Sequence, residues 1–122
     1  MDSINGLALA RIGIGVTAYA APDFFLKGAM LDPSAPQAPY LSRMFAAREI
    51  ALGLVTLLAP PSAKASVISL GIAVDAADAG AGLMALQNKS VSTTTGAVLT
   101  GAALAAVAAG VGGLLQRRSL TA

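Results

Sequence analysis

Four long apolar runs dominate the chain and limit what it can fold into. They cover residues 4–21, 42–59, 66–87 and 93–115. A hydrocarbon core about 30 Å thick takes about 20 helical residues at a rise of about 1.5 Å each. In lipid, a helix satisfies its own backbone hydrogen bonds. The sequence therefore predicts an all-α fold, a four-helix transmembrane bundle that forms one domain over residues 1–122.

The composition agrees with lipid as the surrounding medium. Hydrophobic residues make up 56% of the chain and charged residues 11%, with a mean hydropathy of +0.73. Soluble domains carry charge on about a quarter of their residues. The alternative is an alanine-rich soluble bundle, which needs a charged face at helical spacing, and the sequence has none. We expect the protein to contact a lipid bilayer.

The first span and the orientation leave alternatives open. Ala18-Tyr19-Ala20 resembles a signal-peptide cleavage site. No basic residue precedes this span and Arg11 lies within it, so we expect a retained helix. Basic residues are divided equally between the two sides, and the Arg117-Arg118 pair favours a multi-pass topology with both termini in the cytoplasm.

Missing residue types restrict the chemistry. The chain has no cysteine and no histidine. This excludes disulfides, thiol nucleophiles, the usual zinc sites and histidine-dependent triads. A scattered net charge of +2 does not form a nucleic-acid surface. We expect no cofactor, no metal and no nucleic-acid partner, which leaves carboxylates, arginines, hydroxyls and the backbone to carry any reaction.

Five ionisable residues lie inside the predicted spans: Arg11, Arg48, Glu49, Asp75 and Asp78. A charged side chain at the centre of a bilayer costs at least about 2.5–3.5 kcal/mol, so such residues face one another or a wet cavity. Their depths along the helices predict that Arg11 pairs with Asp75, and Arg48 with Asp78 and Glu49. These five are the candidate catalytic residues.

The charges in this set do not balance. Two guanidiniums face three carboxylates, so one carboxyl group is expected to hold a proton in a medium of low dielectric constant. Neighbouring carboxyls, one protonated and one ionised, can act as general acid and base. The alternative is that the charges only lock the packing of the helices.

The connection over residues 22–41 contains four prolines, which exclude a long regular helix. All five aromatic residues lie in or beside it: Tyr19, Phe24, Phe25, Tyr40 and Phe45. Two interpretations fit. They form an aromatic belt at one membrane surface, or the connection is a lid and these side chains line a substrate pocket.

The fourth predicted span carries two stripes of small residues, one that includes Gly96 and Gly110 and another that includes Gly101 and Gly112. Small residues let helix backbones approach closely. One stripe can pack within the chain and the other against a second copy, which makes a homodimer a consistent arrangement.

Residues 11–15, the proline at 22, residues 47–53 and residues 75–78 resemble an uncharacterised family of small four-helix membrane proteins, loosely related to DoxX-like proteins. The specific elements are Arg48-Glu49 in the second helix and the Asp-x-x-Asp of Asp75 and Asp78 in the third. The resemblance implies a four-helix bundle that shares these polar positions and Arg11. DoxX-like proteins are associated with membrane redox complexes, but this chain lacks the cysteine and histidine that would hold a redox centre.

Together these features predict a membrane-embedded, cofactor-free acid/base enzyme that acts on a lipophilic small molecule by epoxide opening, cyclisation or isomerisation. One alternative is a non-catalytic accessory or scaffold subunit of a membrane complex. A further alternative is a small proton-coupled transporter. A cavity of about 300 Å³ or more that reaches the charged residues favours catalysis or transport.

Overall fold

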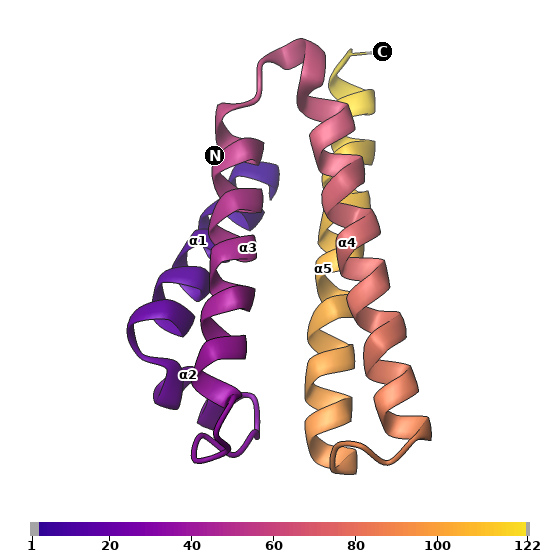
Figure 1. Ribbon diagram of the computed structural model, residues 1–122. Coiled ribbons are helices and arrows are strands. Elements are labelled where there is room, and N and C mark those ends of the chain that lie inside the picture. The colour runs from indigo at the N-terminus through magenta and orange to yellow at the C-terminus, as the bar shows by residue number, and fades with distance from the viewer. Residues whose placement is uncertain (1–2, 122) are drawn as a thin grey trace.

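The computed structural model describes residues 3–121, and within this range the chain forms five helices and no strand. The helices are α1 (Ser3–Ala20), α2 (Pro22–Gly28), α3 (Ala38–Leu58), α4 (Pro61–Gln87) and α5 (Thr93–Thr121) (Figure 1). The expectation of an all-α fold is therefore confirmed.

The four long helices are arranged as two antiparallel pairs. Helix α1 packs along α3, and α4 packs along α5, as the two columns in Figure 1 show. Packing between the two pairs is much sparser and runs mainly from α1 to α5. The bundle is thus two tight pairs in looser contact with each other.

Two of the helices are long and apolar enough to cross a membrane, α4 and, over Thr93–Arg118, α5. Helices α1 and α2 qualify only if they are counted together as one span, which is bent by 118° between them. The sequence predicted four spans. The difference arises because α3 carries Arg43, Arg48 and Glu49 and α1 carries Arg11, which lower the hydropathy of these helices.

The boundaries of the predicted connection were wrong in part. Residues 22–41 include the short helix α2, and α3 begins at Ala38 rather than at residue 42. Proline is favoured in the first turn of a helix, where its missing N–H has no partner to lose, and Pro22 begins α2 in this way. Asp23 in the first turn and Lys27 in the last complement the helix dipole. The prolines therefore set where helices begin as well as where they cannot continue.

The end of α2 is closed by a backbone motif. Leu31 donates its N–H to the Leu26 carbonyl over 2.8 Å, and Met30 between them has a left-handed φ of 62°. The same arrangement ends α4, where Ser90 donates to Ala85 over 3.1 Å and Lys89 has a φ of 56°. Both are Schellman-type ends, although the left-handed position is usually taken by glycine.

Close approach between α1 and α3 depends on two glycines. A Cβ at Gly53 would lie 2.7 Å from the Ala8 carbonyl oxygen, and one at Gly15 would lie 2.9 Å from that of Ala46. Each glycine also contacts an isoleucine of the opposite helix: Ile50 packs on Gly15, and Ile12 packs on Gly53. The two sets have the same spacing: Ala8, Ile12 and Gly15 on α1, and Ala46, Ile50 and Gly53 on α3. The interface therefore has a local two-fold relation, with Arg11 and Glu49 at equivalent positions.

The small residues of α5 divide as two stripes. Gly96 receives Leu86 and Gly110 receives Ile72, so the first stripe packs against α4 within the chain. A Cβ at Gly101 or Gly112 would have no neighbour within 4 Å. The second stripe therefore lies uncovered on the surface.

Substituting Gly53 by alanine is expected to destabilise the protein by about 1–3 kcal/mol, because the new methyl group meets a backbone oxygen that cannot move aside. The matched substitution is Gly101→Ala, where space is free and the higher helix propensity of alanine adds up to about 1 kcal/mol of stability. Unfolding of both variants in detergent, followed by circular dichroism, measures the difference. Equal stability of the two variants would contradict this packing.

Candidate active site

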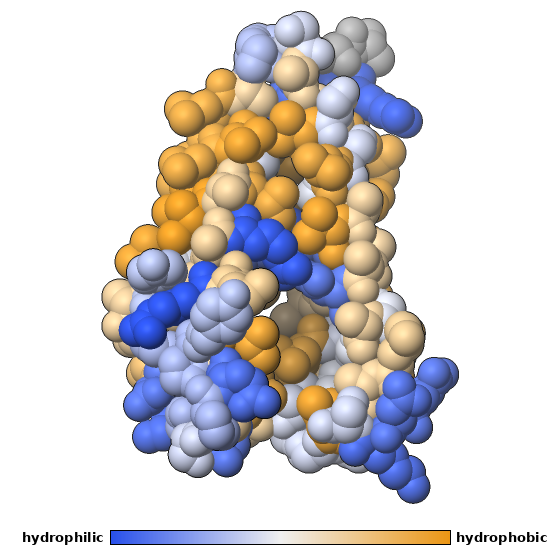
Figure 2. Space-filling model, in the orientation of Figure 1, coloured by the Kyte–Doolittle hydropathy of each residue, from blue (hydrophilic) through white to orange (hydrophobic). Residues whose placement is uncertain are grey.

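Five ionisable side chains from three helices meet near the middle of the bundle, and we call them the charged cluster. They are Arg11 of α1, Arg48 and Glu49 of α3, and Asp75 and Asp78 of α4. Figure 2 shows hydrophilic residues at mid-height, with apolar surface above them. The charged residues of three helices thus pair with one another.

Arg11 binds two carboxylates at once. Its Nη1 donates to the two oxygens of Glu49 over 3.2 and 3.1 Å, and its Nη2 donates to Asp75 Oδ2. The three side chains are only 7%, 6% and 5% exposed. We call these residues the buried triad. One guanidinium here serves two carboxyl groups, so the triad is where the surplus acid of the cluster lies.

Arg48 and Asp78 form a second, more open pair. Arg48 Nη1 and Nη2 donate to the two oxygens of Asp78 over 3.1 and 2.7 Å, a bidentate geometry. These side chains are 39% and 34% exposed. The Arg48 guanidinium also lies 5.1 Å above the ring centre of Phe45. We call Arg48 and Asp78 the accessible pair.

The expected contacts of Arg11 with Asp75 and of Arg48 with Asp78 are both present. The expected pairing of Arg48 with Glu49 is also present, as a salt bridge of 3.9 Å, but Glu49 makes closer contacts with Arg11, which were not predicted. Consecutive helical residues point about 100° apart. Glu49 therefore faces α1 while Arg48 faces α4.

The ion pairs join the two helix pairs to each other. Arg11 links α1 to α4, and Arg48 links α3 to the same helix. Since other packing across this boundary is sparse, the charged cluster is a principal connection between the two halves of the bundle.

A cavity of about 1010 Å³ lies between the helix pairs, and all five members of the charged cluster line it. It extends from the cluster toward α2, where Figure 2 shows the surface hollowed below the hydrophilic residues. The wall formed by α5 consists of small and apolar residues: Gly96, Val98, Leu99, Ala102, Ala103 and Ala106. The volume exceeds what a drug-sized molecule needs.

The opposite side of the buried triad is nearly closed. The space there, lined by Ile4, Ile68 and Gly110 among others, is about 20 Å³. That is room for about one water molecule. Of these two spaces beside the charged cluster, the large cavity is the one with room for a ligand.

The aromatic residues divide between the two interpretations. Phe24, Phe25 and Phe45 line the cavity, and the rings of Phe25 and Phe45 stack with centres 5.4 Å apart. Tyr19 and Tyr40 are not among the lining residues, and both are largely exposed. The three phenylalanines thus lie where a pocket wall was expected, and the two tyrosines lie where a membrane-surface belt would place them.

Some lining residues were not anticipated from the sequence. Ala10, Gly13 and Thr17 form the α1 wall, on a different face from the stripe that packs against α3. Thr17 donates its hydroxyl to the Gly13 carbonyl over 2.9 Å, so this wall offers few free polar groups. The helical spacing of these small residues is a signal that could have identified the wall.

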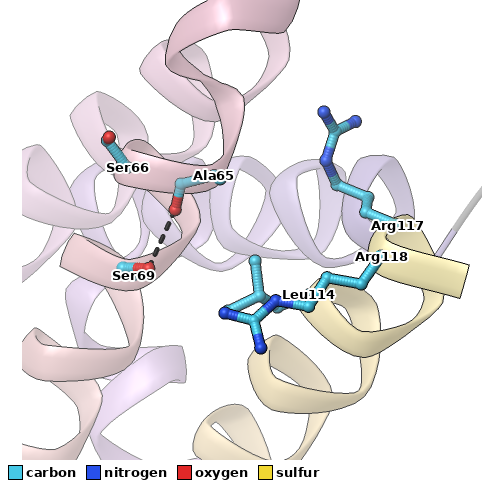
Figure 3. A pocket seen from close by; sticks show the side chains of 6 residues that line it. All are labelled: Ala65, Ser66, Ser69, Leu114, Arg117 and Arg118. Atoms are coloured by element: carbon cyan, nitrogen blue, oxygen red, sulfur yellow. Dashed lines mark hydrogen bonds between the residues drawn. The ribbon is translucent and has the colours of Figure 1, made fainter. Parts of the chain in front are cut away.

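A second hollow, of about 490 Å³, lies at the opposite end of the molecule, between the start of α4 and the end of α5. Its lining residues are Ala65, Ser66, Ser69, Leu114, Arg117 and Arg118 (Figure 3). The Arg118 side chain extends past Leu114 toward α4, whereas Arg117 points away. Ser69 donates its hydroxyl to the Ala65 carbonyl over 2.9 Å. This end is basic and lacks the paired acids of the charged cluster.

Comparison with family models, curated proteins and solved structures finds no match to this chain. The resemblance to small four-helix membrane proteins stays a prediction. Function has to be inferred from the geometry of the cavity and the charged cluster.

Substituting Arg11 by glutamine is expected to destabilise the protein by about 3–5 kcal/mol, because the buried Glu49 and Asp75 would lose the guanidinium that hydrogen-bonds to both. The matched substitution Arg48→Gln is expected to cost about 1 kcal/mol or less, since its pair with Asp78 is partly open to solvent. Unfolding of both variants in detergent measures the difference.

Adding Glu49→Gln and Asp75→Asn to Arg11→Gln removes the unpaired charges and should recover part of the lost stability. If Arg48→Gln proves the more damaging variant, the assignment of the buried triad is incorrect.

Proposed function

We propose that this protein is a membrane-embedded enzyme that applies acid/base chemistry to a lipophilic small molecule without a cofactor. The observation that carries the proposal is the cavity of about 1010 Å³ that reaches all five members of the charged cluster. Epoxide opening, cyclisation and double-bond isomerisation all need a proton donor and a proton acceptor beside an apolar substrate. The charged cluster and the apolar walls supply both.

We propose further that α1, α3, α4 and α5 all cross the bilayer. The length and hydropathy of α4 and α5 support this. The ionisable groups of α1 and α3 turn toward the charged cluster, while large apolar side chains cover the outside: Leu9, Val16, Leu54, Leu70 and Leu104. Helix α1 begins and helix α5 ends in the same half of Figure 1, and Arg117 and Arg118 favour the cytoplasm for that side.

The contacts suggest which groups take which role. Asp78 receives two hydrogen bonds from Arg48, an arrangement that suits an ionised carboxylate, and it is the most exposed acid of the cluster. In this proposal Asp78 is the general base. Glu49 shares its guanidinium with Asp75, and it lines the cavity, so it is the proposed general acid.

Epoxide opening illustrates the balance of protons. Glu49 donates its proton to the epoxide oxygen as the carbon–oxygen bond breaks. Asp78 accepts a proton from the water or hydroxyl that attacks the carbon. Arg11 and Arg48 hold the two carboxyl groups in place, and return of one proton from Asp78 to Glu49 completes the cycle.

A scaffold subunit is the second candidate. It is favoured by the ion pairs that engage every member of the charged cluster and by the position of the cluster between the two helix pairs, which are what a purely structural lock requires. The uncovered stripe with Gly101 and Gly112 would then dock a membrane partner or a second copy. A proton-coupled transporter is the third candidate, since it needs the same cavity and the same exchangeable proton.

The enzyme proposal is tested with purified protein in lipid nanodiscs and three probes: a long-chain terminal epoxide, a linear polyene and a β,γ-unsaturated steroid ketone. The wild type is expected to convert at least one, as measured by mass spectrometry. Asp78→Asn and Glu49→Gln should each lower the rate by about a hundredfold or more, because each removes a proton-transfer group. Asp23→Asn, which changes an exposed acid on α2, is the control and should leave the rate unchanged.

Three outcomes would contradict the enzyme proposal or replace it. If the wild type leaves all three probes unchanged, catalysis of this kind is excluded. If Asp78→Asn and Glu49→Gln both fold and keep full activity, the charged cluster takes no part in the reaction. Uptake of a probe into liposomes that depends on a pH gradient, without conversion, would favour the transporter.

The topology is a separate prediction. Reporter fusions at both termini should be active on the cytoplasmic side, and a reporter inserted after Lys89 should be active on the opposite side. Two termini on different sides would contradict the four-span arrangement.

A further inference from the structure

We infer that the ligand of the cavity is a lipophilic molecule with a positively charged centre, either a stable cation or one formed when the protein protonates it. This inference rests on the proposed function for the identity of the site and adds the class of substrate. It follows from the charge of the cluster, the aromatic wall and the mouth of the cavity.

The charge of the cluster favours a cation. With all groups ionised, Arg48 and Asp78 cancel, and the buried triad has one guanidinium against two carboxylates. In the proposed function Glu49 holds a proton and the cluster is neutral. When that proton leaves, the cavity carries one net negative charge in surroundings of low dielectric constant, where the attraction of a positive centre is much stronger than in water. An anionic ligand would be repelled at the same place.

The aromatic wall already holds one cation. The Arg48 guanidinium lies over Phe45, and Phe25 stacks on the same ring. Aromatic faces attract positive charge whether or not the cation can donate hydrogen bonds. Phe24 and Phe25 also line the cavity and present further ring surface to a ligand.

The mouth of the cavity selects an apolar ligand. Ile14, Val98 and Leu99 line the cavity and are exposed. A molecule that enters between α1 and α5 therefore passes apolar side chains before it reaches the accessible pair. A strongly hydrated cation such as a metal ion gains nothing from such a path, whereas an organic cation keeps its apolar groups in contact.

The proposed reaction makes the same kind of species. When Glu49 gives its proton to an alkene carbon or an epoxide oxygen, the positive charge passes to the substrate and Glu49 becomes a carboxylate. The charge disappears when Asp78 removes a proton from the neighbouring carbon or from attacking water. A stable organic cation therefore resembles the substrate at its most reactive point, and such resemblance brings tight binding.

The probe is benzyltrimethylammonium, compared with its neutral isostere neopentylbenzene and with the anion phenylmethanesulfonate. Binding is measured by equilibrium dialysis against nanodiscs with protein, after subtraction of the uptake by empty nanodiscs. The cation is expected to bind at least about tenfold more tightly than the neutral isostere, a difference typical of a desolvated cation–π contact together with a net charge. The anion should show no binding above the empty nanodiscs.

Two variants locate the bound cation. Glu49→Gln removes the carboxyl group that becomes negative when its proton leaves, and Phe25→Leu removes a ring. Each should weaken binding of the cation about fivefold or more. Tyr40→Leu removes an exposed ring outside the cavity and is the matched control. Should Glu49→Gln fail to fold, Phe25→Leu against Tyr40→Leu decides the question alone.

The inference is overturned if the neutral isostere binds as tightly as the cation, or if Tyr40→Leu weakens binding as much as Phe25→Leu does. Its failure is distinct from failure of the proposed function. Tight binding of the cation without conversion of any probe would contradict the enzyme proposal and support the inferred class of ligand. If a probe is converted and benzyltrimethylammonium does not inhibit the reaction, the enzyme proposal is supported and the inferred class of ligand is contradicted.

Discussion

The contact of Arg11 with two carboxylates is the interaction on which the rest of the structure depends. Glu49 comes from α3 and Asp75 from α4, so one guanidinium on α1 ties three helices together at the centre of the bundle. All three groups are buried, and none could remain charged there alone without a cost of several kcal/mol. The same contact joins the helices and gives the site one carboxyl group more than it has guanidiniums. That surplus carboxyl group is the one that can hold a proton.

The cavity is a consequence of how the helices are paired. Within each pair, glycines such as Gly53 and Gly96 let the backbones or side chains come close, and little space remains. Between the pairs, the charged cluster holds the halves together near their middle, and small residues of α5 do not fill the space on one side of it. The ion pairs of the charged cluster, together with the sparse packing elsewhere between the helix pairs, thus leave a cavity beside buried acids.

Much of this arrangement could be predicted from the sequence, and the misses have physical causes. The helical rise was enough to bring Arg11 level with Asp75, and Arg48 level with Asp78. It was not enough to predict that Glu49 contacts Arg11 more closely than Arg48, because the direction in which a side chain points depends on how each helix is rotated about its axis. The α2 helix was missed because prolines were taken as breaks, although Pro22 begins a helix. The α5 wall carries no charge or aromatic ring that would have marked it, so only packing in three dimensions reveals it.

The nearly closed space on one side of Arg11 has a consequence for a bilayer protein. Below the buried triad the cavity is large, and on the other side only about 20 Å³ is left around Ile4 and Ile68. In a membrane, the open part would face the leaflet that contains α2, and the closed part would face the leaflet near the chain ends. Under the proposed four-span topology, a hydrophobic compound dissolved in lipid would therefore be drawn from a single leaflet, which gives the site a directional supply.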